Sequence, residues 1–321
     1  MRDEDIIESK PRKTPPPAPA GQRENRRSEL RPDPYSPSLR GNRVHSKTKA
    51  FAVLRTVGHY GHLRAVEVGR VQWPASPPNY AEMRAKEFLA KLLTAGHVLC
   101  MSDAYRQRSF IVSPRGAACL RQGGAWGKDG LGLRLGGAHF RDRWICTRFL
   151  IEQGVLGLEP YGEYALQDEW APVNRTELTR RFGLMLDGLV FARAPKRITG
   201  TADLVKVVSS RPPAAELEAL LSIASHSGSW LDSNELVRLA RLVIVSQAEN
   251  QWIIPALKRY LVDHRQPDGS LPRIALVRCQ IEMPLIWRGY EELDAAQLLR
   301  LNGMITADGA RQVPSEPATS A

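Results

Sequence analysis

The stretch from Asp187 to Leu221 constrains the fold of this chain most tightly. Two apolar runs within it, DGLVFA and DLVKVV, have the composition of β-strands, and a short basic loop separates them. A connection this short joins antiparallel neighbours, so the two runs are predicted to form a β-hairpin. The residues that follow Pro213 have the pattern of a helix.

Two further apolar runs, LVIVS and IALVRCQI, extend this pattern towards the C-terminus. Helices are predicted at 214–224 and 250–263, the second interrupted at Pro255. Strands that alternate with helices pair at least partly in parallel, whereas the hairpin is antiparallel. The sequence therefore predicts a mixed sheet flanked by helices, an α/β domain that spans 138–302.

Residues 48–122 carry a different pattern. Three helical segments, KAFAVLRTVGHY, LRAVEVGRVQW and NYAEMRAKEFLAKLLTAG, precede two β-prone runs, HVLCMS and RSFIVS. The third helix is predicted to have Asn79 as its N-cap and Gly96 just past its end. Three helices followed by a hairpin predict a winged helix-turn-helix domain.

The remaining segments connect or flank these two domains. Residues 123–137 are rich in glycine and predict a linker, while 1–47 and 303–321 are predicted to be disordered because they contain few apolar residues. An amphipathic helix is predicted for AHFRDRWICTRFLIEQG, with His139 near its start as a polar cap-region residue or a catalytic group. Asn174 is predicted to cap a short helix.

The charge balance indicates a partner. The chain has a net charge of +11 and a pI near 9.7, and arginine outnumbers lysine. Guanidinium groups pair with phosphates bidentately, so DNA is the expected partner. The candidate phosphate contacts lie on the third helix and the wing: Arg84, Lys86, Lys91, Arg106 and Arg108. The alternative is a charged outer face on a domain that contacts proteins.

Cysteine usage and hydropathy indicate the compartment. The four cysteines, Cys100, Cys119, Cys146 and Cys279, form no CxxC pair, which argues against a zinc site and a disulfide framework. No apolar run is long enough to cross a bilayer, and acidic residues occupy the N-terminus where a signal peptide has none. A cytoplasmic protein without a membrane partner is expected.

The hairpin also carries the candidate catalytic residues. Asp187 heads its first strand, and the second strand carries Asp203 and Lys206. A divalent cation such as Mg²⁺ needs converging oxygen ligands, and a lysine can hold the attacked phosphate, so these residues define a candidate nuclease site with Asp187 as metal ligand. Glu216 is an alternative second acid. Ordinary solvated charges on a hairpin explain the same residues without any catalysis.

Five features together resemble the replication-relaxation family of bacterial plasmids and integrative elements. They are the winged helix, a helix opening with H-x-x-D-R, the phrase LDGLVF, the unit LVKVVSSRPPAAELEALL and a strand ending in MPLIWRG. The resemblance covers about residues 48–300. It implies a winged-helix domain joined to a domain with the fold of restriction endonucleases, and a role in replication, its control or transfer of a mobile element.

The chain departs from the pattern of that family at the acids. Asp187 matches the acid of the DGL phrase, but Lys206 and Val208 stand where a V-E-V-E strand has its two acids, and Pro212 stands where an S-x-K lysine is expected. For an acid-x-lysine triplet, Leu204 replaces the acid. Asp203 lies three residues before Lys206 and should therefore point to the opposite face of the strand.

Three functions follow from these observations. The favoured one is a non-enzymatic DNA-binding accessory protein that needs no cofactor. The first alternative is a Mg²⁺-dependent nuclease centred on Asp187, with Asp203 and Lys206. The second is a protein-interaction module that docks through large aromatic residues: Trp230, Trp252 and Trp287.

Overall fold

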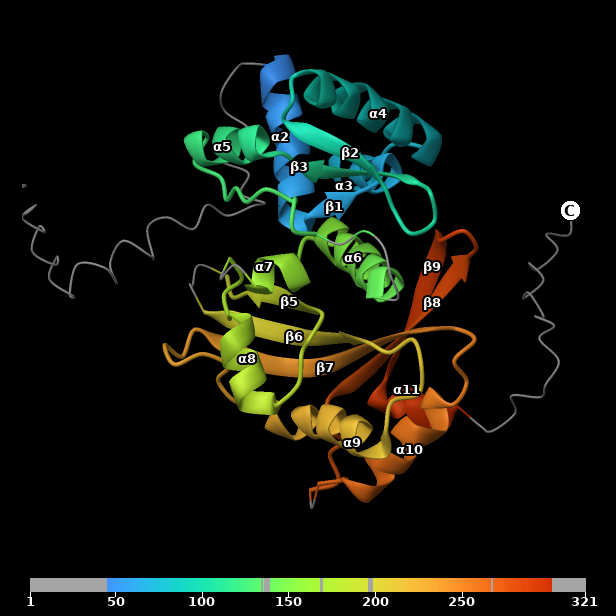
Figure 1. Cartoon of the computed structure of the whole chain (residues 1–321). Helices are drawn as coiled ribbons and strands as arrows, with labels where there is room; N and C mark the ends of the chain where they lie inside the picture. The colour runs from blue at the N-terminus through green and yellow to red at the C-terminus, as the bar shows by residue number, and fades with distance from the viewer. Residues whose placement is uncertain are drawn as a thin grey trace, which may run out of the picture.

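The computed structural model describes residues 45–133, 135, 139–167, 170–195, 199–266 and 268–301, with side chains from residue 48. Figure 1 shows an upper part formed by residues 45–135, here called the N-terminal unit, above a lower part built on a six-stranded sheet, here called the sheet unit. The predicted terminal tails fall outside the described residues, except that the first helix already includes 45–47.

The N-terminal unit contains four helices and a three-stranded antiparallel sheet. Its elements are α2 (His45–Tyr60), β1 (His62–Leu63), α3 (Ala65–Gln72), α4 (Pro78–Thr94), β2 (Val98–Ser102), β3 (Arg108–Val112) and α5 (Pro114–Gln122). The sheet order is β1-β3-β2, and Cys100 pairs with Phe110 in the central register. The predicted three helices and hairpin are present, with β1 as an additional strand.

Helix α4 begins two residues earlier than the capping pattern predicted. Its N-cap is Pro77, with Pro78 as the first helical residue, so the prediction that Asn79 is the N-cap is wrong. Proline is favoured in the first turn because the amide hydrogen that it lacks has no partner inside a helix. The predicted end is confirmed, since Gly96 follows the helix with a φ of 71°.

The glycine-rich stretch after α5 packs against the N-terminal unit. The Gly130 amide donates to the Val112 carbonyl over 2.8 Å, and the Ala104 amide donates to the Leu135 carbonyl over 2.8 Å. Leu135 is buried, and a β-carbon on Gly130 would lie 2.7 Å from that of Ile111. The described part of 123–137, predicted as a linker, therefore covers the three-stranded sheet.

The sheet unit contains a mixed six-stranded sheet of order β4-β5-β6-β7-β8-β9. Strands β6 (Gly200–Val207), β7 (Val237–Gln247) and β8 (Ile274–Glu282) are parallel to one another. Strands β4 (Glu159–Gly162), β5 (Gly188–Arg193) and β9 (Ile286–Asp294) pair antiparallel with their neighbours. The predicted mixed sheet and its β5–β6 hairpin are confirmed.

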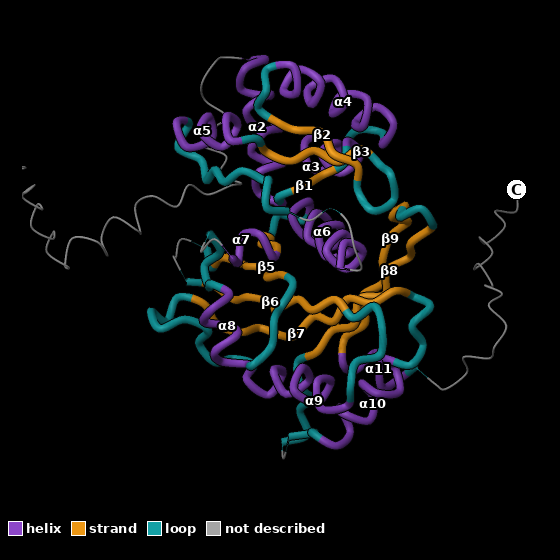
Figure 2. Tube along the Cα trace, in the orientation of Figure 1, coloured by secondary structure: helices purple, strands orange, loops and turns teal. Residues whose placement is uncertain are grey.

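Helices cover both faces of this sheet. In Figure 2 the strands form one layer, with helices above and below it. Alternate residues of β6 separate the two cores, because Val205 and Val207 face α6 (His139–Val155) while Leu204 faces the opposite side. That opposite side is covered by α9 (Ala214–Ser222), α10 (Ile253–Asp263) and α11 (Ala295–Arg300), and two short helices, α7 (Glu163–Gln167) and α8 (Arg175–Phe182), lie near β5.

Helix α6 lies between the two units and is buried on more than one side. Phe140 contacts the rings of His62 and Tyr105 in the N-terminal unit, while Phe149 contacts Tyr290 of β9. The apolar residues of α6, the N-terminal unit and one sheet face form one continuous core. The sequence predicted an amphipathic helix with one apolar side, whereas both units pack against this helix.

Two capping predictions in the sheet unit can be compared with the structure. Asn174 accepts a hydrogen bond from the Glu177 amide over 2.8 Å and caps α8 as predicted. Pro255 does not interrupt α10, because it occupies the third helical position, where the missing amide hydrogen costs no intrahelical bond.

Candidate functional site

The candidate site lies where the start of β5 meets the end of β6. Because Gly188 pairs with Val205, the preceding Asp187 lies beside Lys206 on the neighbouring strand. The Lys206 ammonium lies 3.3 Å from Asp187 Oδ2 and donates to the Met185 carbonyl over 3.0 Å. The Val207 amide donates to Asp187 Oδ2 over 2.8 Å. The structure thus brings together one predicted acid and the predicted lysine.

The Asp187 carboxylate is held in a partly desolvated environment. Its side chain is 27% exposed, and burial raises its pKa, although the nearby Lys206 ammonium and the Val207 amide oppose that rise. The buried thiol of Cys146, on α6, donates to the Asp187 carbonyl over 3.4 Å. Burial and then the charge of Asp187 raise the pKa of this thiol, so it is an inert packing group rather than a nucleophile.

The second predicted acid, Asp203, does not join Asp187. Asp203 pairs with Val190, two positions along the ladder from the Gly188–Val205 pair and towards the start of β6, a separation of about 7 Å along the strand. It forms an ion pair of 2.9 Å with Arg241, which also contacts Glu292. Burial raises the pKa of Asp203, and the Arg241 charge opposes this effect.

These residues do not fit a catalytic Mg²⁺ site. Asp187 and Asp203 each have a cationic partner, and Leu204, in the position of the acid of an acid-x-lysine triplet, is buried in the core. Glu216 is exposed in the first turn of α9. No three His, Cys, Asp or Glu side chains within the described ranges are grouped as metal ligands would be. Mg²⁺ needs several converging oxygens, which this arrangement does not provide.

Polar residues from α6 extend the site along the ends of the parallel strands. Ser209, just after β6, donates to Asp142 over 3.1 Å, and Arg141 contacts Gln247 at the end of β7. The first turn of α6 therefore meets the carboxyl ends of two parallel strands, where open α/β sheets commonly bind ligands. The H-x-x-D-R pattern pointed to this helix, but sequence alone did not indicate its strand partners. His139 is exposed at the start of α6.

A second cluster of charged residues, centred on Glu163 of α7, lies near the start of α6. It forms ion pairs with Arg143 over 3.2 Å and with Arg175 over 3.4 Å. Both arginines are largely buried, and Arg175 also contacts the sulfur of Met185. This group fixes α6 against α7 and α8, so we assign it a structural role.

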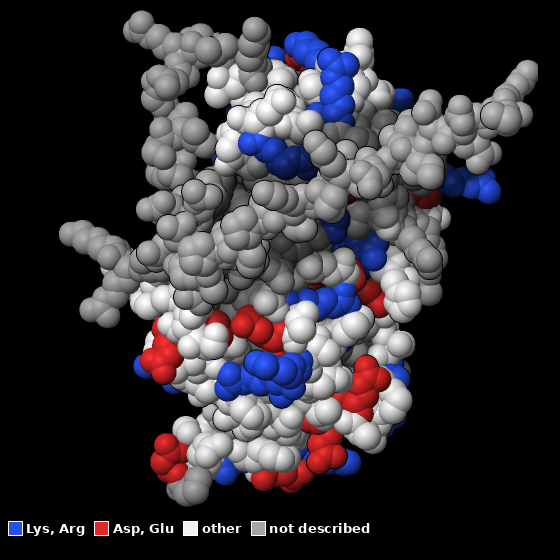
Figure 3. All heavy atoms as spheres, turned by 60° about the vertical axis from the view of Figure 1, so that its left-hand side comes forward, with Lys and Arg blue, Asp and Glu red and all other residues white. Residues whose placement is uncertain are grey.

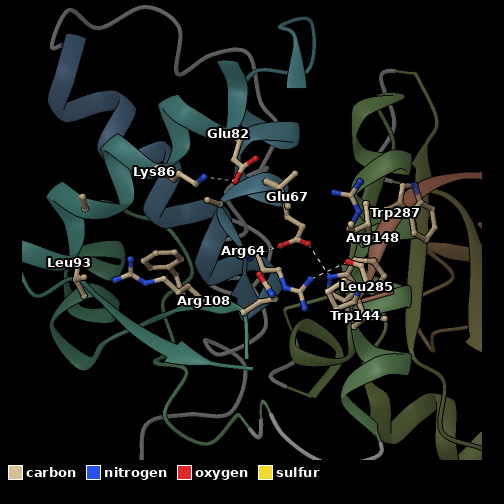
Figure 4. Close-up of a pocket in the computed structure, with 17 residues that line it drawn as sticks. Arg64, Glu67, Glu82, Lys86, Leu93, Arg108, Trp144, Arg148, Leu285 and Trp287 are labelled. Carbon is tan, nitrogen blue, oxygen red and sulfur yellow. Dashed lines mark hydrogen bonds and ion pairs between the residues drawn. The ribbon is translucent and has the colours of Figure 1, made fainter. Parts of the chain in front are cut away.

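The predicted DNA-contacting residues lie on α4 and on the β2–β3 hairpin, as expected. On α4, Lys86 pairs with Glu82 over 2.7 Å, and Glu87 pairs with both Lys91 and Arg84. Arg106 and Arg108 are exposed on the hairpin. Lys86 and Arg108 also line a cavity between the N-terminal unit and the β8–β9 turn (Figure 4). All three α4 cations are held in ion pairs, and Arg84 and Lys91 lie over the Phe88 ring on a different side of the helix from Lys86.

The three tryptophans of the interaction hypothesis are half-buried. Trp287 packs against the core around α6, and Trp252 packs against the core on the other sheet face. Trp230 lies under Arg238, with the guanidinium carbon 4.1 Å from its ring centre. These contacts with the protein's own residues weaken the hypothesis that these indoles form a free docking surface.

Comparisons with family models, with curated proteins and with solved structures find no match to this chain. Within the described part of the chain, no helix has the length and apolarity needed to cross a membrane.

Proposed function

We propose that this chain is a DNA-binding protein whose N-terminal unit contacts the phosphate backbone and whose sheet unit has no nuclease activity. The distribution of charge carries this proposal. Residues 48–133 contain 12 basic and 5 acidic residues, a net charge of +7, whereas 139–301 contain 20 of each. On the face in Figure 3, most of the acidic side chains in view lie on the lower part, where they are mixed with basic ones, and basic side chains prevail above.

The order of elements in the N-terminal unit supports a winged helix-turn-helix interpretation. Three helices precede a two-stranded hairpin, and β1 completes a sheet of order β1-β3-β2. In a DNA-binding domain of this kind, the third helix enters the major groove and the wing lies along the backbone. Those elements here are α4, with Arg84, Lys86 and Lys91, and the β2–β3 hairpin, with Arg106 and Arg108.

The ion pairs on α4 are compatible with this role. Each links residues three or four positions apart on the exposed helix surface, where such a pair contributes about 0.3–0.5 kcal/mol. A phosphate can replace the carboxylate at a comparably small cost. The Glu82 and Glu87 carboxylates would then lie close to the backbone, so the exposed wing arginines should contribute more than the α4 cations.

A gel-shift assay with duplex DNA across a salt series tests the proposal. Five phosphate contacts should weaken binding about 500-fold between about 50 and 200 mM salt. Replacing Arg106 and Arg108 with alanine should lower the slope of log K against log salt by about 2. The matched control replaces Arg259 and Arg265, two exposed arginines of the sheet unit, and should leave the slope unchanged. Absence of binding at low salt would refute the proposal.

Absence of nuclease activity has its own test. Supercoiled plasmid incubated with the protein and Mg²⁺ or Mn²⁺ should stay intact, because the second acid lies on the opposite strand face and is paired with Arg241. Any residual nicking should be equal for the native protein and for Asp187→Ala. Nicking that Asp187→Ala abolishes would instead establish the nuclease alternative.

The resemblance to replication-relaxation proteins suggests the biological setting. We propose that the protein acts in the replication or transfer of a mobile element, and that the sheet unit retains an endonuclease-like arrangement of strands. Support comes from the antiparallel β4-β5-β6 meander, the crossover through α9 and the parallel strand β7, together with an Asp187–Lys206 contact on adjacent strands.

A further inference from the structure

A cavity of about 860 Å³ separates the N-terminal unit from the β8–β9 turn. Helices α3 and α4 and strand β3 form one wall, while α6 and residues 284–287 form the other. Most of the wall is apolar, and exposed or partly exposed side chains at Val66, Leu93 and Ile286 contribute to it. Cavities of this size with an apolar wall and a few polar groups are typical small-molecule sites.

Arg148, on α6, is the unusual residue of this cavity. Its side chain is only 8% exposed, and its Nη2 lies 3.3 Å from Glu152. Nε and Nη1 are buried without an acceptor among the described residues. Glu152 also binds Arg70 over 2.7 Å, so one carboxylate serves two guanidiniums. A buried charged donor without an acceptor is costly, and an anion beside it would remove that cost.

Three of the other charged residues that line the cavity, Arg64, Glu82 and Lys86, are held in ion pairs, whereas Arg108 is exposed on the hairpin. Arg64 contacts Asp103 over 2.6 Å and donates to the Leu285 carbonyl, and Glu82 pairs with Lys86. The buried Glu67 carboxylate accepts from the Trp144 indole over 3.0 Å. Figure 4 shows Arg148 at the end near Trp287 and Arg108 at the opposite end. The lining has four basic and two acidic residues, which favours an anionic ligand.

We propose that this cavity binds a phosphate monoester that carries a flat ring system, a ligand of nucleotide size, with its phosphate on Arg148. The Trp287 indole covers the guanidinium with its ring centre 5.7 Å from the guanidinium carbon. When the ligand binds, the Trp287 indole moves aside and the phosphate accepts hydrogen bonds from Nε and Nη1 of Arg148. The ring system of the ligand lies along the apolar wall. The same chemistry is presented by a free mononucleotide and by the phosphorylated end of a nucleic-acid strand.

Calorimetric titration of the full chain with AMP tests the proposal. AMP should bind, while adenosine, which lacks the phosphate, should bind at least about tenfold more weakly, as loss of a charge-assisted contact predicts. Arg148→Met should bind AMP more weakly than the native chain by the same factor. Arg259→Met, on the exposed face of α10, should bind AMP with unchanged affinity. AMP should also change the tryptophan fluorescence of the native chain, and much less that of Trp287→Phe.

A second variant covers the case in which Arg148→Met does not fold. Ile286 is 41% exposed on the cavity wall, so Ile286→Trp can fill the cavity without disturbing the core. This variant should fold, as judged by circular dichroism, and should not bind AMP. Unchanged AMP affinity in both variants would refute the assignment of this cavity.

A 5′-phosphorylated hexanucleotide distinguishes the two sources of the ligand. Tighter binding of AMP indicates a free nucleotide, and tighter binding of the phosphorylated hexamer than of its unphosphorylated form indicates a strand end. Failure of both to bind at about 1 mM would overturn the proposal. The inference is independent of duplex binding, because Arg148 is buried, and Arg148→Met should retain the gel shift of the native chain.

Discussion

At the scale of single residues, the Asp187–Lys206 pair determines how the candidate site responds to pH. Burial raises the pKa of Asp187, so protonation favours the folded state and the charged form costs stability at neutral pH. Lys206→Met should therefore destabilise the protein by about 1–3 kcal/mol at pH 7, because it removes the cation beside a partly buried carboxylate. The loss should shrink as pH falls through the folded-state pKa of Asp187.

Urea unfolding of Lys206→Met at pH 7 and at lower pH measures this effect. The double variant Asp187→Asn/Lys206→Met is the control, because it removes the uncompensated charge while the asparagine oxygen still accepts from the Val207 amide. At pH 7 the double variant should be more stable than Lys206→Met, and its free energy of unfolding should lie closer to that of the native protein. A double variant as unstable as Lys206→Met would show that the ion pair is not the cause.

The residues of the hairpin show what sequence could predict about the site. Alternation along β6 correctly separated Asp203 from the face of Lys206, because side-chain direction in a strand follows from residue parity alone. The role of Arg148 could not be predicted, since its burial depends on Trp287, far along the chain, and on the N-terminal unit. A basic residue in an amphipathic helix is ordinarily expected to face solvent.

At the scale of elements, the close packing of α3 on α4 depends on Gly69. A β-carbon at this position would lie 2.8 Å from the backbone carbon of Ala81 and 2.9 Å from its oxygen. Gly69→Ala should gain helix propensity but force the two helices apart, for a net loss of about 1–3 kcal/mol. Because α4 carries three predicted phosphate contacts, duplex binding should weaken as well.

Gly132→Ala provides the matched control for this substitution. No heavy atom lies within 4 Å of a β-carbon built there, and its φ lies outside the left-handed region. Thermal unfolding of the two variants side by side should show a lower midpoint for Gly69→Ala only. Equal midpoints would show that the helices can separate at no cost.

The two edge strands of the large sheet are among the elements that were not predicted from the sequence. Strand β4 contains Pro160 and ends at Gly162, and proline is tolerated in a sheet only where its missing amide hydrogen breaks no ladder bond. Strand β9, IWRGYEELD, carries charges and a glycine because much of it stays accessible to solvent. Central strands are apolar and recognisable, whereas edge strands derive their structure from pairing with a neighbour.

At the scale of the whole molecule, α6 makes the two units one folding unit. Sequence predicted separate domains at 48–122 and 138–302, but one continuous core contains α6, the N-terminal helices and one face of the sheet. Phe140→Ala should therefore destabilise the protein by about 3–5 kcal/mol and reduce amide protection in both units. The control is Leu257→Ala, on α10 in the core of the opposite sheet face. It removes a buried side chain that belongs to the sheet unit alone. Hydrogen exchange followed by mass spectrometry measures both. Protection that falls in the N-terminal unit alone after Phe140→Ala would mean that the two units unfold separately.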